Sequence, residues 1–135
     1  MSIVFVYGTL RKNERYSEFL KDAECLRERC WVYGKLYDTG CGYPALTLTK
    51  SSRTYGELYR VNEETLQKIN MLEGYEGPGK DNLYDRVEVD VHTDTGIHRA
   101  FVYVMDADHP MLKKPIEHGD WKSYRLLQEK EHFCD

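Results

Sequence analysis

The amino-acid sequence predicts a single α+β domain, residues 1–135, built on a curled sheet or small barrel. Segments with the composition of strands outnumber segments with helical periodicity, and at least four of them are short and bounded by turn residues. The 135 residues are 41% hydrophobic and 31% charged, a composition typical of a globular domain with its own core. A doubly wound sheet is the less favoured alternative.

The first predicted elements are a strand over residues 3–7 and a helix over residues 14–25. The strand is a short run of β-branched and aromatic residues, IVFVY, that closes on Gly8. The helix is predicted because three large apolar residues within it would share one face.

Three further strands are predicted over residues 29–37, 44–49 and 54–61. The first two alternate between apolar and polar residues, and the turn-rich segment DTGCGYP separates them. The third, TYGELYRV, has the aromatic and aliphatic content of a strand.

A second helix is predicted over residues 63–73. Asn62 is a favourable N-cap, and the two glutamates that follow it complement the helix dipole in the first turn. Gly74 ends this helix and opens a loop over residues 74–82, which is rich in glycine and charge.

The remaining chain is predicted to form a hairpin and a final helix. The hairpin strands are LYDRVEVDVHT and IHRAFVYVM, which turn across Asp94-Thr95-Gly96. After a loop that starts at Asp106, a helix is predicted near residues 121–130.

Charge and composition exclude several classes of function. The net charge is −4 and the basic residues are scattered, so we expect no nucleic-acid partner. No apolar run approaches the roughly 20 residues that span a bilayer, and the N-terminus lacks a signal-peptide pattern, so we expect no membrane partner and a cytoplasmic location. The cysteines and histidines lack ligand spacing, so we expect structural thiols, no metal and no cofactor.

One glutamate interrupts the apolar stripe of the second helix. Leu66 and Ile69 define the inward face, and the next position on that face is Glu73. Burial there would raise the pKa of its carboxyl toward neutrality, which suits a proton acceptor and donor. The alternative is a structural role, in which Glu73 turns to solvent or pairs with an arginine such as Arg86. Glu76 is a rival that Gly74 is expected to leave in the loop.

The turn after the first strand has two interpretations. In the sequence YGTLR, Gly8 could let consecutive backbone N–H groups approach an anion or a developing oxyanion. Alternatively, Gly8 only turns the chain and Thr9 caps the next element. Arg11 is either a supporting charge or the start of that element.

Several short motifs, in this order and spacing, resemble the γ-glutamylcyclotransferase family from Ile3 to Trp121. They are Tyr7-Gly8-Thr9-Leu10, Gly56 in a later strand, Leu66-x-x-Ile69-Asn70-x-x-Glu73-Gly74, Tyr84-x-Arg86 and Gly119-Asp120-Trp121. The resemblance implies a small mixed β-barrel, a curled sheet of about five to seven strands flanked by helices, with one pocket at the end of the first strand. It also implies a substrate-binding set of Tyr7, Gly8, Thr9, Leu10 and Tyr84, with Tyr43 as a weaker member, and Glu73 as the catalytic residue.

The chain departs from the family pattern at two places. The family aspartate before the glutamate is Asn70 here, which removes one negative charge. The loop carries a second glutamate-glycine pair, Glu76-Gly77, that fits a shifted frame. We prefer Glu73, because the shifted frame would bury Gly74 inside the helix.

The resemblance implies a reaction in which the α-amine of a γ-glutamyl amide attacks its own γ-carbonyl, giving 5-oxoproline and a free amine. One carboxylate can serve as both general base and general acid for these proton transfers. A non-catalytic binding module for γ-glutamyl groups or small anions, and an amide hydrolase that uses water, are the alternatives. The leaving amine and the oligomeric state stay open.

Overall fold

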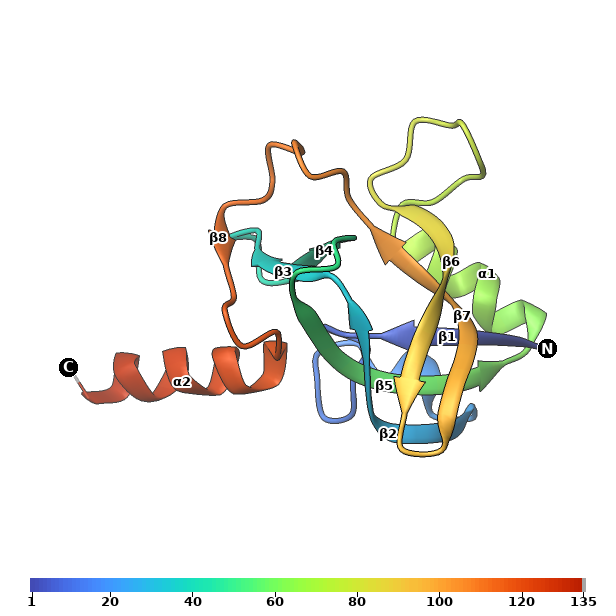
Figure 1. Cartoon of the computed structure of the whole chain (residues 1–135), viewed down its shortest axis with the longest axis horizontal. Helices are drawn as coiled ribbons and strands as arrows, with labels where there is room; N and C mark the ends of the chain where they lie inside the picture. Colours follow the sequence, from blue (N-terminus) through green and yellow to red (C-terminus); the bar gives the residue numbers. More distant parts are fainter. Residues whose placement is uncertain (135) are drawn as a thin grey trace.

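A closed barrel of five strands forms the centre of the computed structural model, which describes the backbone of residues 1–134 and the side chains of residues 1–129 (Figure 1). The strands run in the order β1-β5-β2-β6-β7, and the parallel pair of β1 with β7, at Val4 and Phe101, closes the ring. The other neighbours are antiparallel. The predicted α+β fold with a small mixed barrel is therefore confirmed. The barrel strands are β1 (Ser2–Val6), β2 (Glu24–Tyr33), β5 (Arg53–Val61), β6 (Asp85–Thr93) and β7 (Gly96–Val104).

A second sheet of three strands lies beside the barrel, in the order β4-β3-β8. Its strands are β3 (Lys35–Asp38), β4 (Pro44–Thr47) and β8 (Lys114–Pro115). The single strand predicted over residues 29–37 is wrong, because Gly34 divides it between the two sheets. A Cβ on Gly34 would lie 2.5 Å from Leu46 Cδ1, so any side chain where the chain crosses would have to displace the buried side chain of Leu46.

The predicted helix over residues 14–25 is also wrong. Only a 3₁₀ turn, Ser17–Leu20, forms there, and β2 already begins at Glu24. Glu24 and Cys25 pair with Arg60 and Tyr59 of β5. This pairing across the barrel outweighs the helical periodicity of the segment.

Helix α1 (Glu63–Leu72) begins and ends close to the predicted positions. The side chain of Asn62 accepts a hydrogen bond of 2.8 Å from the Thr65 N–H, as an N-cap does. Gly74, with φ of +66°, ends the helix in the left-handed conformation. Leu66 and Ile69 are buried against the outside of the barrel, which fixes the direction in which the last turn points.

Strand β1 has apolar residues on both faces because both are covered. Phe5 packs in the cluster that fills the barrel, together with Leu58 and Val102. Val4 and Val6 pack in a second cluster between the barrel and α1. A strand buried on both sides reads as a continuous apolar run, which explains IVFVY.

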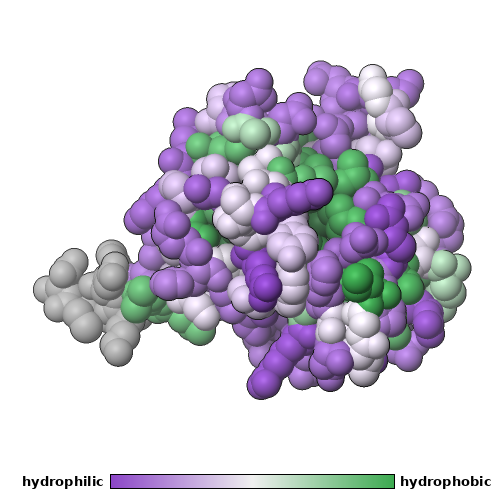
Figure 2. Space-filling model, viewed as in Figure 1, coloured by the Kyte–Doolittle hydropathy of each residue, from purple (hydrophilic) through white to green (hydrophobic). Residues whose placement is uncertain are grey.

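The hairpin of β6 and β7 has the predicted turn, since Thr93 pairs with Gly96 and the register continues to Asp85 and Val104. Helix α2 (Trp121–Cys134) starts with a buried tryptophan and then runs away from the barrel (Figure 1). Among the described residues, neither helix has the length and apolarity needed to cross a membrane. The face in Figure 2 is mostly hydrophilic, with hydrophobic residues in small separate areas.

Candidate active site

The turn after β1 leaves three consecutive backbone donors unused. Arg11 N–H bonds to Gly8 O at 3.0 Å, and Tyr16 N–H bonds to Thr9 O at 2.8 Å, so the carbonyl groups hold the turn closed. The N–H groups of Gly8, Thr9 and Leu10 make no hydrogen bond within the part of the chain that the structure describes. Consecutive free N–H groups in such a turn form a concavity suited to an anion.

Gly8 packs directly against the second sheet. A Cβ at this position would lie 2.6 Å from Cγ and 2.8 Å from Cδ of Pro44, at the start of β4. No side chain fits in that space without displacing the proline ring. The glycine is therefore required by a close approach of two chain segments.

Arg11 clamps the turn to the barrel. Its buried guanidinium donates to Glu57 Oε2 at 3.0 Å and to Asp120 Oδ1 at 3.1 Å. Glu57 Oε1 also accepts from the Lys12 N–H and the Tyr59 hydroxyl, each at 2.9 Å. This network fixes the segment that follows the three free donors, so Arg11 is a supporting charge.

Glu57 was missed at the sequence level, although a signal existed. It lies within the apolar part of β5, next to Leu58, and pairs with Val6 at the end of β1. A carboxylate in an otherwise buried run needs a partner, and a cation directly after the neighbouring strand would have been a candidate.

Glu73 lies at the end of α1 and faces a cavity of about 280 Å³. Burial raises the pKa of its carboxyl to about 7. Within the described side chains, its carboxylate has no hydrogen bond and no ion pair. A carboxylate of this kind can accept and return a proton near neutral pH.

Arg86 does not pair with Glu73. Its Nη1 donates to Asn70 Oδ1 at 3.3 Å, and its guanidinium lies 4.2 Å from the ring centre of Phe101 and 4.9 Å from that of Tyr75. The ion pair considered as an alternative is therefore absent from the described residues.

Glu76 is exposed and does not line the cavity. Its N–H bonds to Asn82 Oδ1 at 2.7 Å within a loop that is closed on itself by further hydrogen bonds. No residue from 74 to 82 lines the cavity.

The cavity brings the predicted site residues together. Its walls come from the end of β1 and the following turn, from β4, from the end of α1, and from the segments before β6 and at the end of β7. The site residues named from the sequence that line it are Tyr7, Gly8, Thr9, Leu10, Tyr43, Glu73 and Tyr84. They come from four separate segments of the chain, which only the fold makes adjacent.

Tyrosine side chains make up much of the cavity wall, and they stay uncharged. Burial, together with the nearby Glu73 carboxylate, raises the pKa of Tyr7, Tyr84 and Tyr103. The hydroxyl of Tyr7 donates to Tyr103 O at 2.6 Å, and that of Tyr84 donates to Pro44 O at 2.7 Å. Glu73 is thus the one ionisable acid or base other than tyrosine among the described residues that line the cavity.

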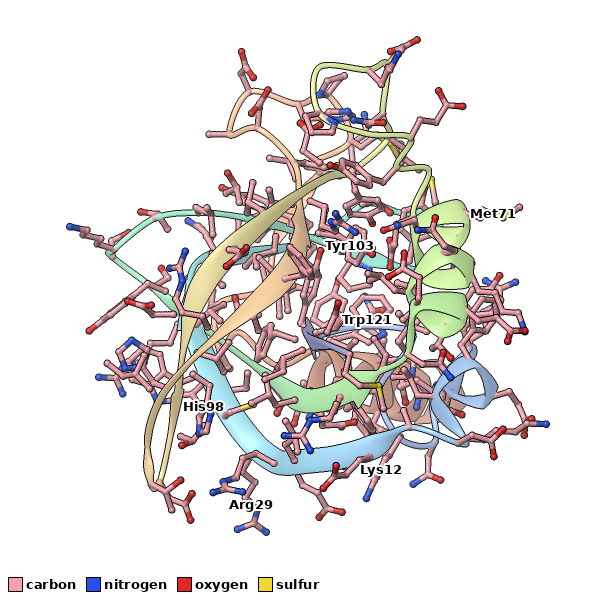
Figure 3. All side chains as sticks on the ribbon, turned by 90° about the vertical axis from the view of Figure 1, so that its right-hand side faces the viewer. Lys12, Arg29, Met71, His98, Tyr103 and Trp121 are labelled. Atoms are coloured by element: carbon pink, nitrogen blue, oxygen red, sulfur yellow. The ribbon has the colours of Figure 1, made fainter. Side chains whose placement is uncertain are left out.

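Tyr103 is not among the site residues predicted from the sequence, because alternation in β7 says only that it lies on the opposite face from Val102, outside the barrel and toward α1. Its hydroxyl donates to Asn70 Oδ1 at 2.5 Å, which ties β7 to the last turns of α1. Figure 3 shows Tyr103 in the interior beside the helix, whereas Met71 points outward. Asn70 therefore holds a cavity wall in place.

Among the described residues, no three His, Cys, Asp or Glu side chains lie where they could hold one metal ion. Cys25, Cys30 and Cys41 are free thiols, and burial raises the pKa of Cys30 to about 12. The side chain of Cys134 lies outside the described residues.

Residues 4–123 match the model of the family "Gamma-glutamyl cyclotransferase, AIG2-like". The chain is 42% identical to gamma-L-glutamyl-butirosin B gamma-glutamyl cyclotransferase of Niallia circulans, over 97% of this chain and 85% of that protein. It is also 42% identical to a putative gamma-glutamylcyclotransferase of Halalkalibacterium halodurans, over 76% of this chain and 90% of that protein.

Solved structures show the same fold. YkqA from Bacillus subtilis superposes with a TM-score of 0.76 at 30% identity, over 96% of this chain and 42% of that chain. An AIG2-like protein from Mus musculus superposes with a TM-score of 0.72 at 23% identity, over 90% of this chain and 88% of that chain.

Proposed function

Since the chain belongs to the γ-glutamylcyclotransferase family of enzymes, we propose that it converts a γ-glutamyl amide or γ-glutamyl amino acid to 5-oxoproline and a free amine. The observation that carries the proposal is the pairing of two features in one cavity. A carboxylate with a pKa of about 7, Glu73, shares that cavity with the three unused N–H groups of residues 8–10.

The substrate supplies its own nucleophile. Its α-amine attacks the γ-carbonyl carbon, a C–N bond forms to close a five-membered ring, and the γ-amide C–N bond breaks. Because nucleophile and carbonyl are already tethered, the substrate itself supplies much of the roughly 7 to 11 kcal/mol by which an intramolecular reaction can exceed a bimolecular one, and the protein mainly has to hold the folded conformer. No covalent intermediate with the protein is needed.

Glu73 would carry the proton transfers of the reacting groups. As the carboxylate it takes a proton from the substrate α-ammonium, and as the acid it gives one to the departing nitrogen, so the side chain returns to its starting form. The second proton that the ring nitrogen loses after the attack passes to the released amine, which leaves as an ammonium. A pKa near the working pH favours both steps, because neither form of the carboxyl is rare.

The free N–H groups of Gly8, Thr9 and Leu10 would hold the negative part of the substrate, either its α-carboxylate or the oxyanion that develops on the γ-carbonyl. No lysine or arginine is among the described residues that line this cavity, so backbone dipoles are the donors at hand. Tyr84 and Tyr43 would form the cavity wall that packs against the methylene groups of the substrate's γ-glutamyl chain.

The test is 5-oxoproline release from a panel of γ-glutamyl amides by the wild type, Glu73→Gln and Glu76→Gln. We expect release by the wild type and Glu76→Gln and none by Glu73→Gln. Release of free glutamate instead would point to an amide hydrolase, and binding of γ-glutamyl compounds without any product would point to a binding module. Loss of activity in Glu76→Gln alone would overturn the assignment of the base.

A further inference from the structure

A second cavity, of about 340 Å³, lies beside the first and shares Thr9 with it. The second cavity is formed by the segment after the turn, by Gly42 in the loop before β4, and by the first residues of α2. An amine that leaves a γ-glutamyl group held in the first cavity needs such an adjoining space.

Most of the charge around the second cavity is already paired. Glu14 is buried, and its two oxygens accept from Arg125 Nε and Nη2, each at 2.8 Å. Arg125 Nη1 donates to Glu129 Oε1, also at 2.8 Å. These groups hold α2 against the turn and leave little charge for a ligand.

Arg15 is the cation that these pairs do not use. It is exposed, and within residues 1–129 it forms no ion pair with a carboxylate. Its guanidinium lies 5.4 Å from the ring centre of Tyr16, and its Nη1 would be 3.3 Å from a Cβ on Gly42. It thus stands between Tyr16 and the residue before Tyr43, and both of these tyrosines line the first cavity.

We propose that the second cavity receives the leaving amine and that Arg15 selects one bearing a carboxylate, as an α-amino acid does. The inference rests on the proposed function, which brings a γ-glutamyl group into the first cavity. Arg15 has five N–H donors in a planar fork that suits a carboxylate. A neutral amide in place of that carboxylate loses the charge attraction, and a cationic leaving group is repelled.

The experiment compares γ-glutamyl-alanine with γ-glutamyl-alaninamide, which differ only in the terminal carboxylate. For each enzyme the ratio of kcat/KM for the two substrates is measured, in the wild type, Arg15→Gln and Arg15→Lys. The change in ratio between variants cancels the unequal basicity of the two leaving amines. Arg29→Gln is the matched control, because Arg29 is also exposed and lies at the edge of the molecule, away from Tyr103 (Figure 3).

We expect Arg15→Gln to lower the preference for the carboxylate roughly fivefold, the upper range for an exposed ion pair. Arg15→Lys should retain most of the preference, and Arg29→Gln all of it. The preference should also shrink as salt rises from about 0.02 M to about 0.5 M. Dissociation constants of both ligands for Glu73→Gln and for Glu73→Gln/Arg15→Gln give the same comparison without turnover.

Two outcomes separate this inference from the proposed function. Release of 5-oxoproline with a ratio that Arg15→Gln leaves unchanged would overturn the role of Arg15 and keep the reaction. Binding of both ligands with an Arg15-dependent ratio, but no 5-oxoproline, would support the subsite and overturn the reaction. Neither release nor binding would overturn both.

Discussion

Replacing Glu73 by glutamine is expected to stop turnover and to stabilise the fold at alkaline pH. The wild-type carboxyl has a pKa of about 7 in the folded protein, against an ordinary value of 4.5, because burial disfavours its charged form. Glutamine has nearly the same shape and never ionises. The substitution therefore removes the free-energy cost of burying an ionised carboxylate, and it also removes the general base.

The magnitude follows from the shift in pKa. Below pH 4.5 the carboxyl is protonated in both states and contributes nothing. Between pH 4.5 and about 7 the unfolded chain loses the proton while the folded protein keeps it, so the free energy of unfolding falls as pH rises. Above pH 7 the loss is complete, and at 1.36 kcal/mol per pKa unit it is at most about 3 kcal/mol.

The assay is urea denaturation of the wild type, Glu73→Gln and Glu76→Gln at pH 4 and at pH 8.5. We expect Glu73→Gln to match the wild type at pH 4 and to exceed it by up to about 3 kcal/mol at pH 8.5. The exposed control Glu76→Gln should stay within about 0.5 kcal/mol of the wild type at both pH values.

Turnover gives an independent reading of the same titration. The kcat/KM of the wild type should fall about tenfold per pH unit below pH 7, because the protonated carboxyl cannot accept a proton. A stability difference between Glu73→Gln and wild type that does not change with pH would refute the argument, since it would mean that Glu73 titrates as an ordinary glutamate.

Three further substitutions test the support of the site. Gly8→Ala should lower kcat/KM at least about tenfold by pushing the turn off Pro44, and Gly8→Ala/Pro44→Ala should recover part of the loss, which steady-state kinetics would show. Glu57→Gln should lower the free energy of unfolding by about 3 kcal/mol in urea, whereas Glu24→Gln, in an exposed pair, should cost less than about 1 kcal/mol. Asn70→Asp should keep kcat/KM within about threefold of the wild-type value, because the new carboxylate would accept hydrogen bonds from Arg86 and Tyr103, which already donate to Asn70. A much larger loss of kcat/KM across the pH profile would contradict this.

The elements that could be predicted from the sequence are those whose signals are local. Helix α1 has its N-cap, its inward stripe and its terminal glycine within a dozen residues, and the β6–β7 hairpin has its turn residues in place. Residues 14–25 have a helical pattern as well, but Glu24 and Cys25 at the end of this segment pair with strand β5 instead. Strand β8 is only two residues long and forms by pairing with the edge of β3. No pattern within its own sequence predicts that pairing.

The same division holds in the candidate site. The inward position of Glu73 follows from the spacing of Leu66 and Ile69, because one helix carries all three. The clamp between Arg11 and Glu57 joins residues 46 positions apart, and the bond from Tyr103 to Asn70 spans 33 positions. Such pairs depend on which strands become neighbours, and strand order is not encoded in any one segment.

The distribution of charge over the two cavities gives a reason for keeping a cation out of the cavity in which Glu73 would transfer protons. A lysine or arginine beside Glu73 would bind the substrate carboxylate strongly, but it would also lower the pKa of the glutamate and weaken it as a base. Backbone N–H groups attract an anion through partial charges and leave the cavity without a cation. Arg15 stands in the neighbouring cavity, and burial alone accounts for the pKa of Glu73. Under the proposed mechanism, recognition of negative charge and proton transfer at neutral pH can therefore operate side by side.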